Sequence, residues 1–164
     1  MKQLPNFILE KLSLNRQSKT YLTLDDFAKK YHLEKNDSNR HCVEYNVDND
    51  VIDMFEKLNN INKESLDKSI KYITSKFDLK VGWLLTYDID DQYLKFCLEQ
   101  REFRSIAGTN VLATFIVTYN DEIRYFWPDK EFTNKTFADD QKITKQDIIE
   151  IEAIIFTWID YLLS

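Results

Sequence analysis

Glycine, proline, cysteine and histidine are scarce in this sequence. Only 2 Gly and 2 Pro occur in 164 residues, which excludes collagen-like chains, flexible linkers and glycine-rich phosphate-binding loops. Two cysteines are too few for a disulfide-rich secreted scaffold. The first apolar stretch, Phe7 to Leu9, is too short for a signal peptide, and no apolar run approaches the ~18 residues of a membrane-spanning helix. We therefore expect a cytoplasmic protein with reduced thiols.

The composition is that of a chain with a substantial core. Hydrophobic residues make up 43% and aromatic residues 14%, which excludes an intrinsically disordered chain. The length fits one globular domain, residues 1–164, able to bury roughly 70% of its unfolded surface. The net charge of −6 removes any overall attraction to nucleic acid or anionic membranes. Lysine, asparagine and isoleucine are abundant, as in proteins of low-GC bacteria and their phages.

Apolar periodicity and capping residues predict several helices. Thr23, followed by two aspartates, caps a short amphipathic helix, and Asn62 caps a longer one. Thr144 and Asp147 form a capping box before a strongly apolar C-terminal helix, which must be largely covered. The expected helical segments are 5–14, 23–33, 49–58, 62–77 and 144–163.

Runs of β-branched and aromatic residues predict strands at 79–89, 111–119 and 122–127, the last two forming a hairpin, and a short edge strand at 41–47. The polar segment 34–40 is expected to be a loop. Residues 91–106 fit either state: alternating Leu94, Phe96 and Leu98 suit a strand, whereas the helix-forming composition favours a helix. Together, the expected helices and strands predict an α+β protein, with a small, mainly antiparallel sheet packed against several helices.

Known catalytic and metal-binding patterns find little support. His32, His41, Cys42 and Cys97 lack zinc-ligand spacing. Segment 88–99 places acidic or amide residues as in a calcium-binding loop, but Tyr93 occupies the position that requires glycine. Cys97 is expected to be a small core residue, and no serine lies in a nucleophile elbow. We therefore expect no catalytic residue, metal or cofactor.

Two alternative functions have some support in the sequence. Asp129, Asp140 and Lys142 have a spacing similar to the Pro-Asp and Asp/Glu-x-Lys motif of restriction-nuclease-like enzymes, in which two carboxylates hold a divalent ion. That motif lies on a core strand, whereas here its second half lies in polar sequence before a helix. Segment 22–33 is similar to the first helix of a helix-turn-helix, which would suit a DNA-associated accessory protein.

The hypothesis we favour is a protein that binds another protein. Small size, acidity and few cysteines suit an inhibitor, immunity or anti-defence protein. Two acidic turns should meet at one end of the sheet, whether 91–106 is a crossover helix or a returning strand. This rim would attract a basic surface on the partner. Its members are Asp88, Asp90, Asp91, Asp121 and Glu122.

Overall fold

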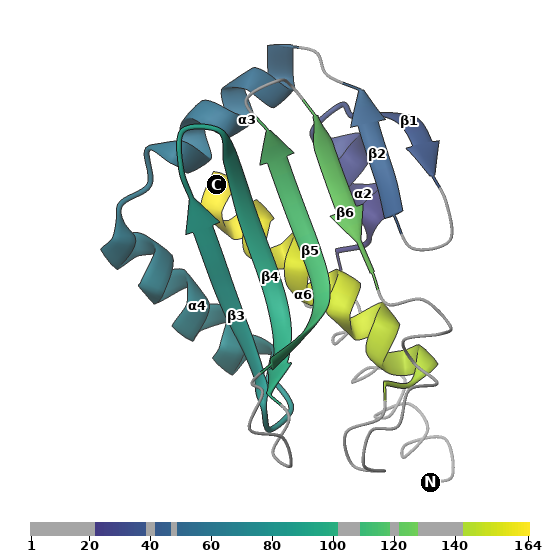
Figure 1. The fold of residues 1–164 in the computed structure, drawn as a ribbon, viewed down its shortest axis with the longest axis vertical. Coiled ribbons are helices and arrows are strands. Elements are labelled where there is room, and N and C mark those ends of the chain that lie inside the picture. Colours follow the sequence, from purple (N-terminus) through teal and green to yellow (C-terminus); the bar gives the residue numbers. More distant parts are fainter. Residues whose placement is uncertain (1–21, 39–41, 47–48, 102–108, 119–121, 128–142) are drawn as a thin grey trace, which may run out of the picture.

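A computed structural model describes residues 22–38, 42–46, 49–101, 109–118, 122–127 and 143–164. These residues form four helices and six strands (Figure 1). In chain order they are α2 (Leu24–Lys30), β1 (Glu34–Ser38), β2 (Cys42–Asn46), α3 (Asn49–Asn59), α4 (Lys63–Phe77), β3 (Trp83–Ile89), β4 (Tyr93–Arg101), β5 (Thr109–Thr118), β6 (Ile123–Phe126) and α6 (Lys145–Leu163). The helix expected at 5–14 lies outside the described residues.

The six strands form one antiparallel sheet in the order β1-β2-β6-β5-β4-β3. The β5–β6 hairpin is confirmed, and β2 (Cys42–Asn46) confirms a strand within the segment 41–47. The expectation that this strand lies at the edge of the sheet was wrong, because β1 pairs with its outer side and β6 with its inner side. β3 begins at Trp83, later than expected, because a turn at Lys80 to Gly82 precedes it. Gly82 has φ 90°, a conformation that favours glycine, and its carbonyl accepts the Arg101 amide at 2.8 Å.

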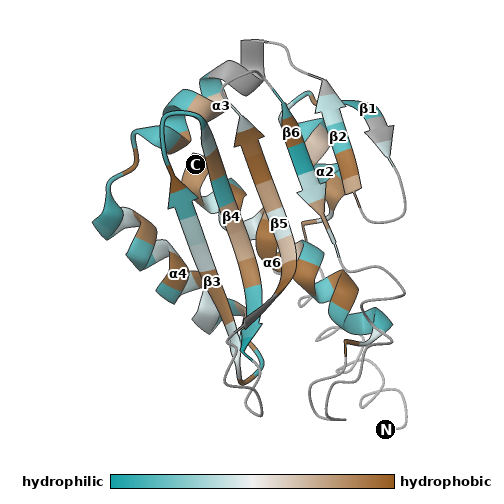
Figure 2. Ribbon diagram, viewed as in Figure 1, coloured by the Kyte–Doolittle hydropathy of each residue, from teal (hydrophilic) through white to brown (hydrophobic). Residues whose placement is uncertain are grey.

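The four described helices lie on one face of the sheet, with α6 crossing behind β4 and β5 (Figure 1). Alternate strand residues point toward them, which explains why Leu94, Phe96 and Leu98 of β4 are all buried. Figure 2 shows the corresponding hydrophobic colours along β4, β5 and α6. The expected covering of α6 is confirmed: Ile151, Ile155, Trp158 and Ile159 are fully buried.

Capping side chains fix the helix starts where the sequence places them. Thr23 accepts a hydrogen bond from the Asp26 amide at 3.1 Å, and Thr144 accepts one from the Asp147 amide at 3.1 Å. Both helices have the reciprocal bond of a capping box. Asn62 caps α4 by accepting the Ser65 amide at 2.8 Å.

Two local expectations were wrong. Segment 91–106 was expected to favour a helix, but Tyr93–Arg101 is strand β4, because its apolar alternation buries one face between β3 and β5. Segment 34–40 was expected to be a loop, but Glu34–Ser38 is strand β1. Backbone pairing with β2 stabilises this polar segment as an edge strand, with an irregularity between Lys35 and Asp37.

Candidate functional site

The β3–β4 hairpin places three predicted rim residues at one end of the sheet. Asp88 is the penultimate residue of β3, and Asp90 and Asp91 form the turn that follows. All three are exposed, and Figure 2 shows hydrophilic colour on this turn. Tyr93 pairs in register with Thr118 at the end of β5. The β3–β4 turn and the end of β5 therefore lie at the same end of the sheet.

Hydrogen bonds within the hairpin hold two of these carboxylates in place. Asp90 Oδ1 accepts the amides of Gln92 at 2.6 Å and Tyr93 at 2.9 Å, which is an Asx-type turn. The Tyr93 hydroxyl donates to Asp88 Oδ2 at 2.8 Å, and this bond, with the nearby charges of Asp88 and Asp90, raises the pKa of Tyr93. The hairpin thus presents carboxylates of defined position.

The other two predicted rim residues are placed differently. Glu122 is half-buried at the start of β6 and forms an ion pair with Arg124 at 2.9 Å, so its charge is compensated. Asp121 lies outside the described residues. Asp88 lies opposite Lys95 in the β3–β4 ladder, but within the described residues Asp88, Asp90 and Asp91 form no ion pair. The described rim residues with uncompensated charge are therefore Asp88, Asp90 and Asp91.

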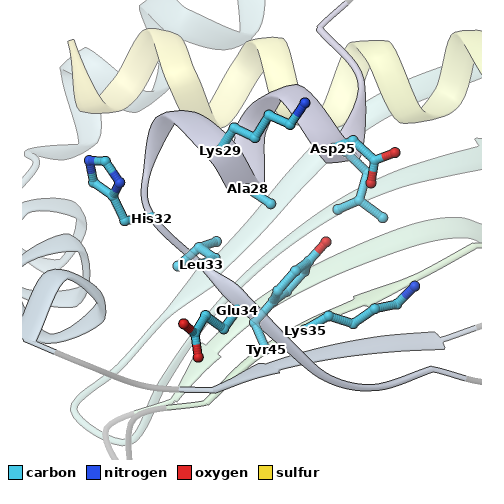
Figure 3. A pocket seen from close by; sticks show the side chains of 9 residues that line it. Asp25, Ala28, Lys29, His32, Leu33, Glu34, Lys35 and Tyr45 are labelled. Atoms are coloured by element: carbon cyan, nitrogen blue, oxygen red, sulfur yellow. The ribbon is translucent and has the colours of Figure 1, made fainter.

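A broad hollow of about 570 Å³ lies between α2 and the β1–β2 edge (Figure 3). Tyr45 points from β2 toward α2, and His32 lies beyond the C-terminal end of that helix. Burial, with the charges of Asp25 and Glu152, raises the pKa of the Tyr45 hydroxyl. Lysines and carboxylates both line the hollow, so its charge favours neither anions nor cations. The sequence placed six of these residues in segment 22–33, the candidate first helix of a helix-turn-helix, and Tyr45 in a strand, but it did not predict a hollow between them.

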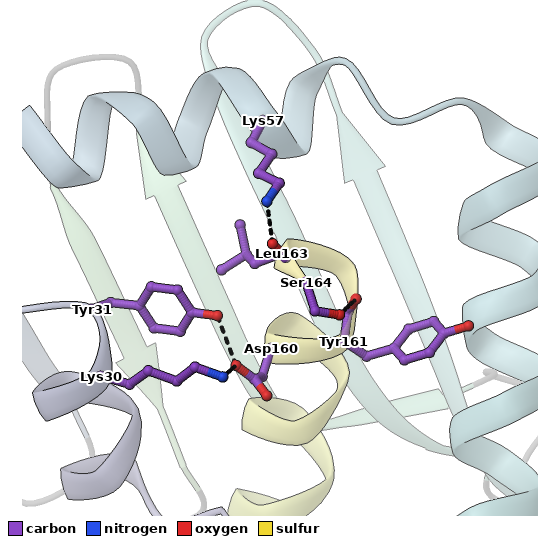
Figure 4. Close-up of polar contacts among 7 residues, drawn as sticks. All are labelled: Lys30, Tyr31, Lys57, Asp160, Tyr161, Leu163 and Ser164. Atoms are coloured by element: carbon purple, nitrogen blue, oxygen red, sulfur yellow. Dashed lines mark hydrogen bonds and ion pairs between the residues drawn. The ribbon is translucent and has the colours of Figure 1, made fainter.

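Polar contacts around the C-terminal end of α6 join this helix to its neighbours (Figure 4). Asp160 Oδ1 accepts the Tyr31 hydroxyl at 2.7 Å and pairs with Lys30 at 2.6 Å, which joins α2 to α6. Lys57 donates to the carbonyl of Leu163, which joins α3 to the same helix end. A cation near the last carbonyls of a helix also complements its dipole.

The described surroundings of Cys97 do not favour nucleophilic catalysis. Cys97 is buried beside Thr114, with 3.5 Å between Sγ and Oγ1, and burial raises the pKa of its thiol. A raised pKa lowers the thiolate fraction, and the thiolate is the reactive form. Within the described ranges, no group of three or more histidine, cysteine or acidic side chains could hold a metal ion.

The residues of the two alternative functions give no site in the described structure. Asp129, Asp140 and Lys142 lie outside the described residues. Helix α2 is followed by strand β1, so segment 34–38 does not supply the second helix of a helix-turn-helix.

The fold and these sites define an α+β protein with a six-stranded antiparallel sheet and an acidic hairpin at one end. No protein-family model, curated protein or solved structure matches the chain. Of the helices in the described part of the chain, none has the length and apolarity to cross a membrane.

Proposed function

We propose that this chain is a small cytoplasmic protein-binding domain whose acidic hairpin, Asp88 to Asp91, meets a basic surface on a partner protein. The observation that carries the proposal is the fixed presentation of exposed carboxylates, with Asp90 anchored by two backbone amides and Asp88 by Tyr93. An inhibitor, immunity or anti-defence protein of a low-GC bacterium or its phage is the role that suits this chemistry and size.

Preorganisation is the physical reason to favour this hairpin over other acidic surface. A partner that pairs with the anchored carboxylates loses less conformational entropy on binding than one that must order mobile side chains. The net charge of −6 adds a long-range component that accelerates encounter with a cationic surface. Ion screening, with a Debye length of about 8 Å at physiological salt, should weaken this component.

Differential affinity capture tests the proposal. Wild-type protein, an Asp91→Lys variant and an Asp78→Lys control are immobilised, and proteins retained from a low-GC bacterial lysate are identified by mass spectrometry. Asp78 is also exposed but precedes β3, at the opposite end of that strand, so the control has the same net charge. We expect the wild type and the control to retain a basic protein that the Asp91→Lys variant does not retain. High salt should elute this protein. Equal retention by all three proteins would refute the role of the hairpin.

A further inference from the structure

A second, smaller cavity of about 130 Å³ lies away from the acidic hairpin. It is lined by Leu24, Tyr125, Trp127, Ile148 and Glu152. Tyr125 belongs to β6 and Trp127 follows it, and β6 runs away from the acidic end of the sheet. The volume well exceeds the share of a single water in the liquid, which is about 30 Å³. The cavity can therefore hold a small organic group.

The hydroxyl of Tyr125 is an unsatisfied polar group beside this cavity. Tyr125 is 2% exposed, and its oxygen has no hydrogen-bond partner among the described residues. Burial, and to a smaller degree the charge of Glu152, raises the pKa of this hydroxyl well above its ordinary value. A buried hydroxyl without a partner costs about 1–3 kcal/mol. Such a group calls for an explanation, and a bound molecule supplies one.

Glu152 brings a carboxylate without a cation to the same cavity. Its Oε1 accepts the Leu24 amide at 2.6 Å, and in the described parts of the chain no lysine or arginine pairs with it. Burial raises the pKa of Glu152, the Leu24 hydrogen bond opposes this shift, and the charges of Asp25 and Asp26 reinforce it. The carboxylates of Asp25, Asp26 and Glu152 therefore lie near one another at the start of α2, and a bound cation would relieve their repulsion.

The aromatic side chains that line the cavity favour one kind of cation. The rings of Tyr125 and Trp127 are 5.8 Å apart between centroids and tilted by 32°. Aromatic faces attract cations, and the planar guanidinium stacks on them while its forked N–H groups bind a carboxylate. We propose that this cavity binds a guanidinium group, either free or on an arginine side chain. Glu152 accepts its N–H groups, the two rings form its walls, and Tyr125 accepts a further hydrogen bond.

This site goes beyond the proposed function and does not depend on it, because it uses no residue of the acidic hairpin. Its test uses methylguanidine as the free ligand, a capped Gly-Arg-Gly peptide as the side-chain form, and methylurea as the neutral control. Binding to the full chain is measured by calorimetry and by NMR shifts of the Trp127 indole. The variants are Glu152→Gln, which keeps an acceptor for Leu24, and Tyr125→Phe, which removes only the hydroxyl. Glu34→Gln, in the neighbouring hollow, is the matched control.

We expect saturable binding of methylguanidine or of the peptide at millimolar concentration or below, and none of methylurea. Glu152→Gln should weaken binding at least about tenfold because it removes a charge-assisted pair, and Tyr125→Phe severalfold, while Glu34→Gln binds as wild type. If methylguanidine binds and the peptide does not, the site takes the free form; the reverse assigns the side chain. Failure of both to bind, equal binding by folded Glu152→Gln, or equal binding of methylurea would overturn the proposal.

Discussion

The buried hydrogen bond between Trp158 and Ser69 provides a quantitative test of the core. Trp158 Nε1 donates to Ser69 Oγ at 2.9 Å, and both residues are fully buried. Ser69 in turn donates to the carbonyl of Leu66 at 2.6 Å. This chain of bonds joins α6 to α4, so that its disruption should act on the packing of these two helices.

Ser69→Ala and Trp158→Phe should each lower the free energy of unfolding, but for different physical reasons. Ser69→Ala leaves the indole N–H buried without an acceptor, which costs about 1–3 kcal/mol. Trp158→Phe leaves the Ser69 donor satisfied but creates a cavity beside Phe96, whose ring packs edge-on at 5.2 Å. Complete truncation of a buried Trp costs about 3–5 kcal/mol, and retention of a phenyl ring should limit the loss to about 2 kcal/mol.

Once the indole N–H is gone, removing the Ser69 hydroxyl should cost little. The double variant should therefore be more stable, by about 1–2 kcal/mol, than the sum of the single changes implies. Urea unfolding followed by circular dichroism measures this, since a coupling of 1 kcal/mol moves the midpoint by about 0.5 M. Ser75→Ala, on the exposed side of α4, is the control and should add to Trp158→Phe. Additivity for Ser69 as well would refute the hydrogen-bond reasoning.

Three further predictions concern single residues. Asp147→Ala should lower the free energy of unfolding by about 1–3 kcal/mol, because it removes a capping bond and a 2.7 Å ion pair with Lys80; an unchanged urea midpoint would contradict this. The raised pKa of Glu152 means that the folded state holds its proton more tightly, so stability falls as pH rises from about 4.3 toward the folded pKa. Glu152→Gln should flatten that fall in urea titrations, and a slope identical to wild type would count against it. Iodoacetamide should label half-buried Cys42 before Cys97 in the native protein, and equal rates by mass spectrometry would be inconsistent with the burial and raised pKa of Cys97.

The fold class could be predicted from the sequence because its strongest signals are local. The cap at Thr23, the capping box at Thr144 and the apolar face of α6 determine helix positions without reference to the rest of the chain. Strand β1 could not be predicted, because the polar residues Glu34–Ser38 become a strand only through pairing with β2. The helix expected at 91–106 was wrong for a related reason. The composition of this segment favours a helix, but burial between two neighbouring strands overrides that preference in Tyr93–Arg101.

The acidic hairpin and the guanidinium cavity also differ in whether the sequence could predict them. The acidic hairpin could be predicted, because strand direction alone places the turn after β3 and the end of β5 at one end of the sheet. The guanidinium cavity could not, because it joins residues far apart in the chain, Leu24, Tyr125 and Glu152. The signal available in the sequence was Glu152 itself, an acidic residue among the apolar residues of the predicted C-terminal helix. A carboxylate at such a position requires a partner, and the structure supplies the Leu24 amide.

The central claim, that the acidic hairpin guides a basic partner, is tested most directly by the salt dependence of the association rate. The captured partner is mixed with wild type, Asp91→Lys or the Asp78→Lys control in stopped flow at low and high salt. We predict that wild type and control associate at least about tenfold faster at low salt, that Asp91→Lys is slower there, and that all three rates converge at high salt. Equal rates for Asp91→Lys and Asp78→Lys at low salt would contradict the claim.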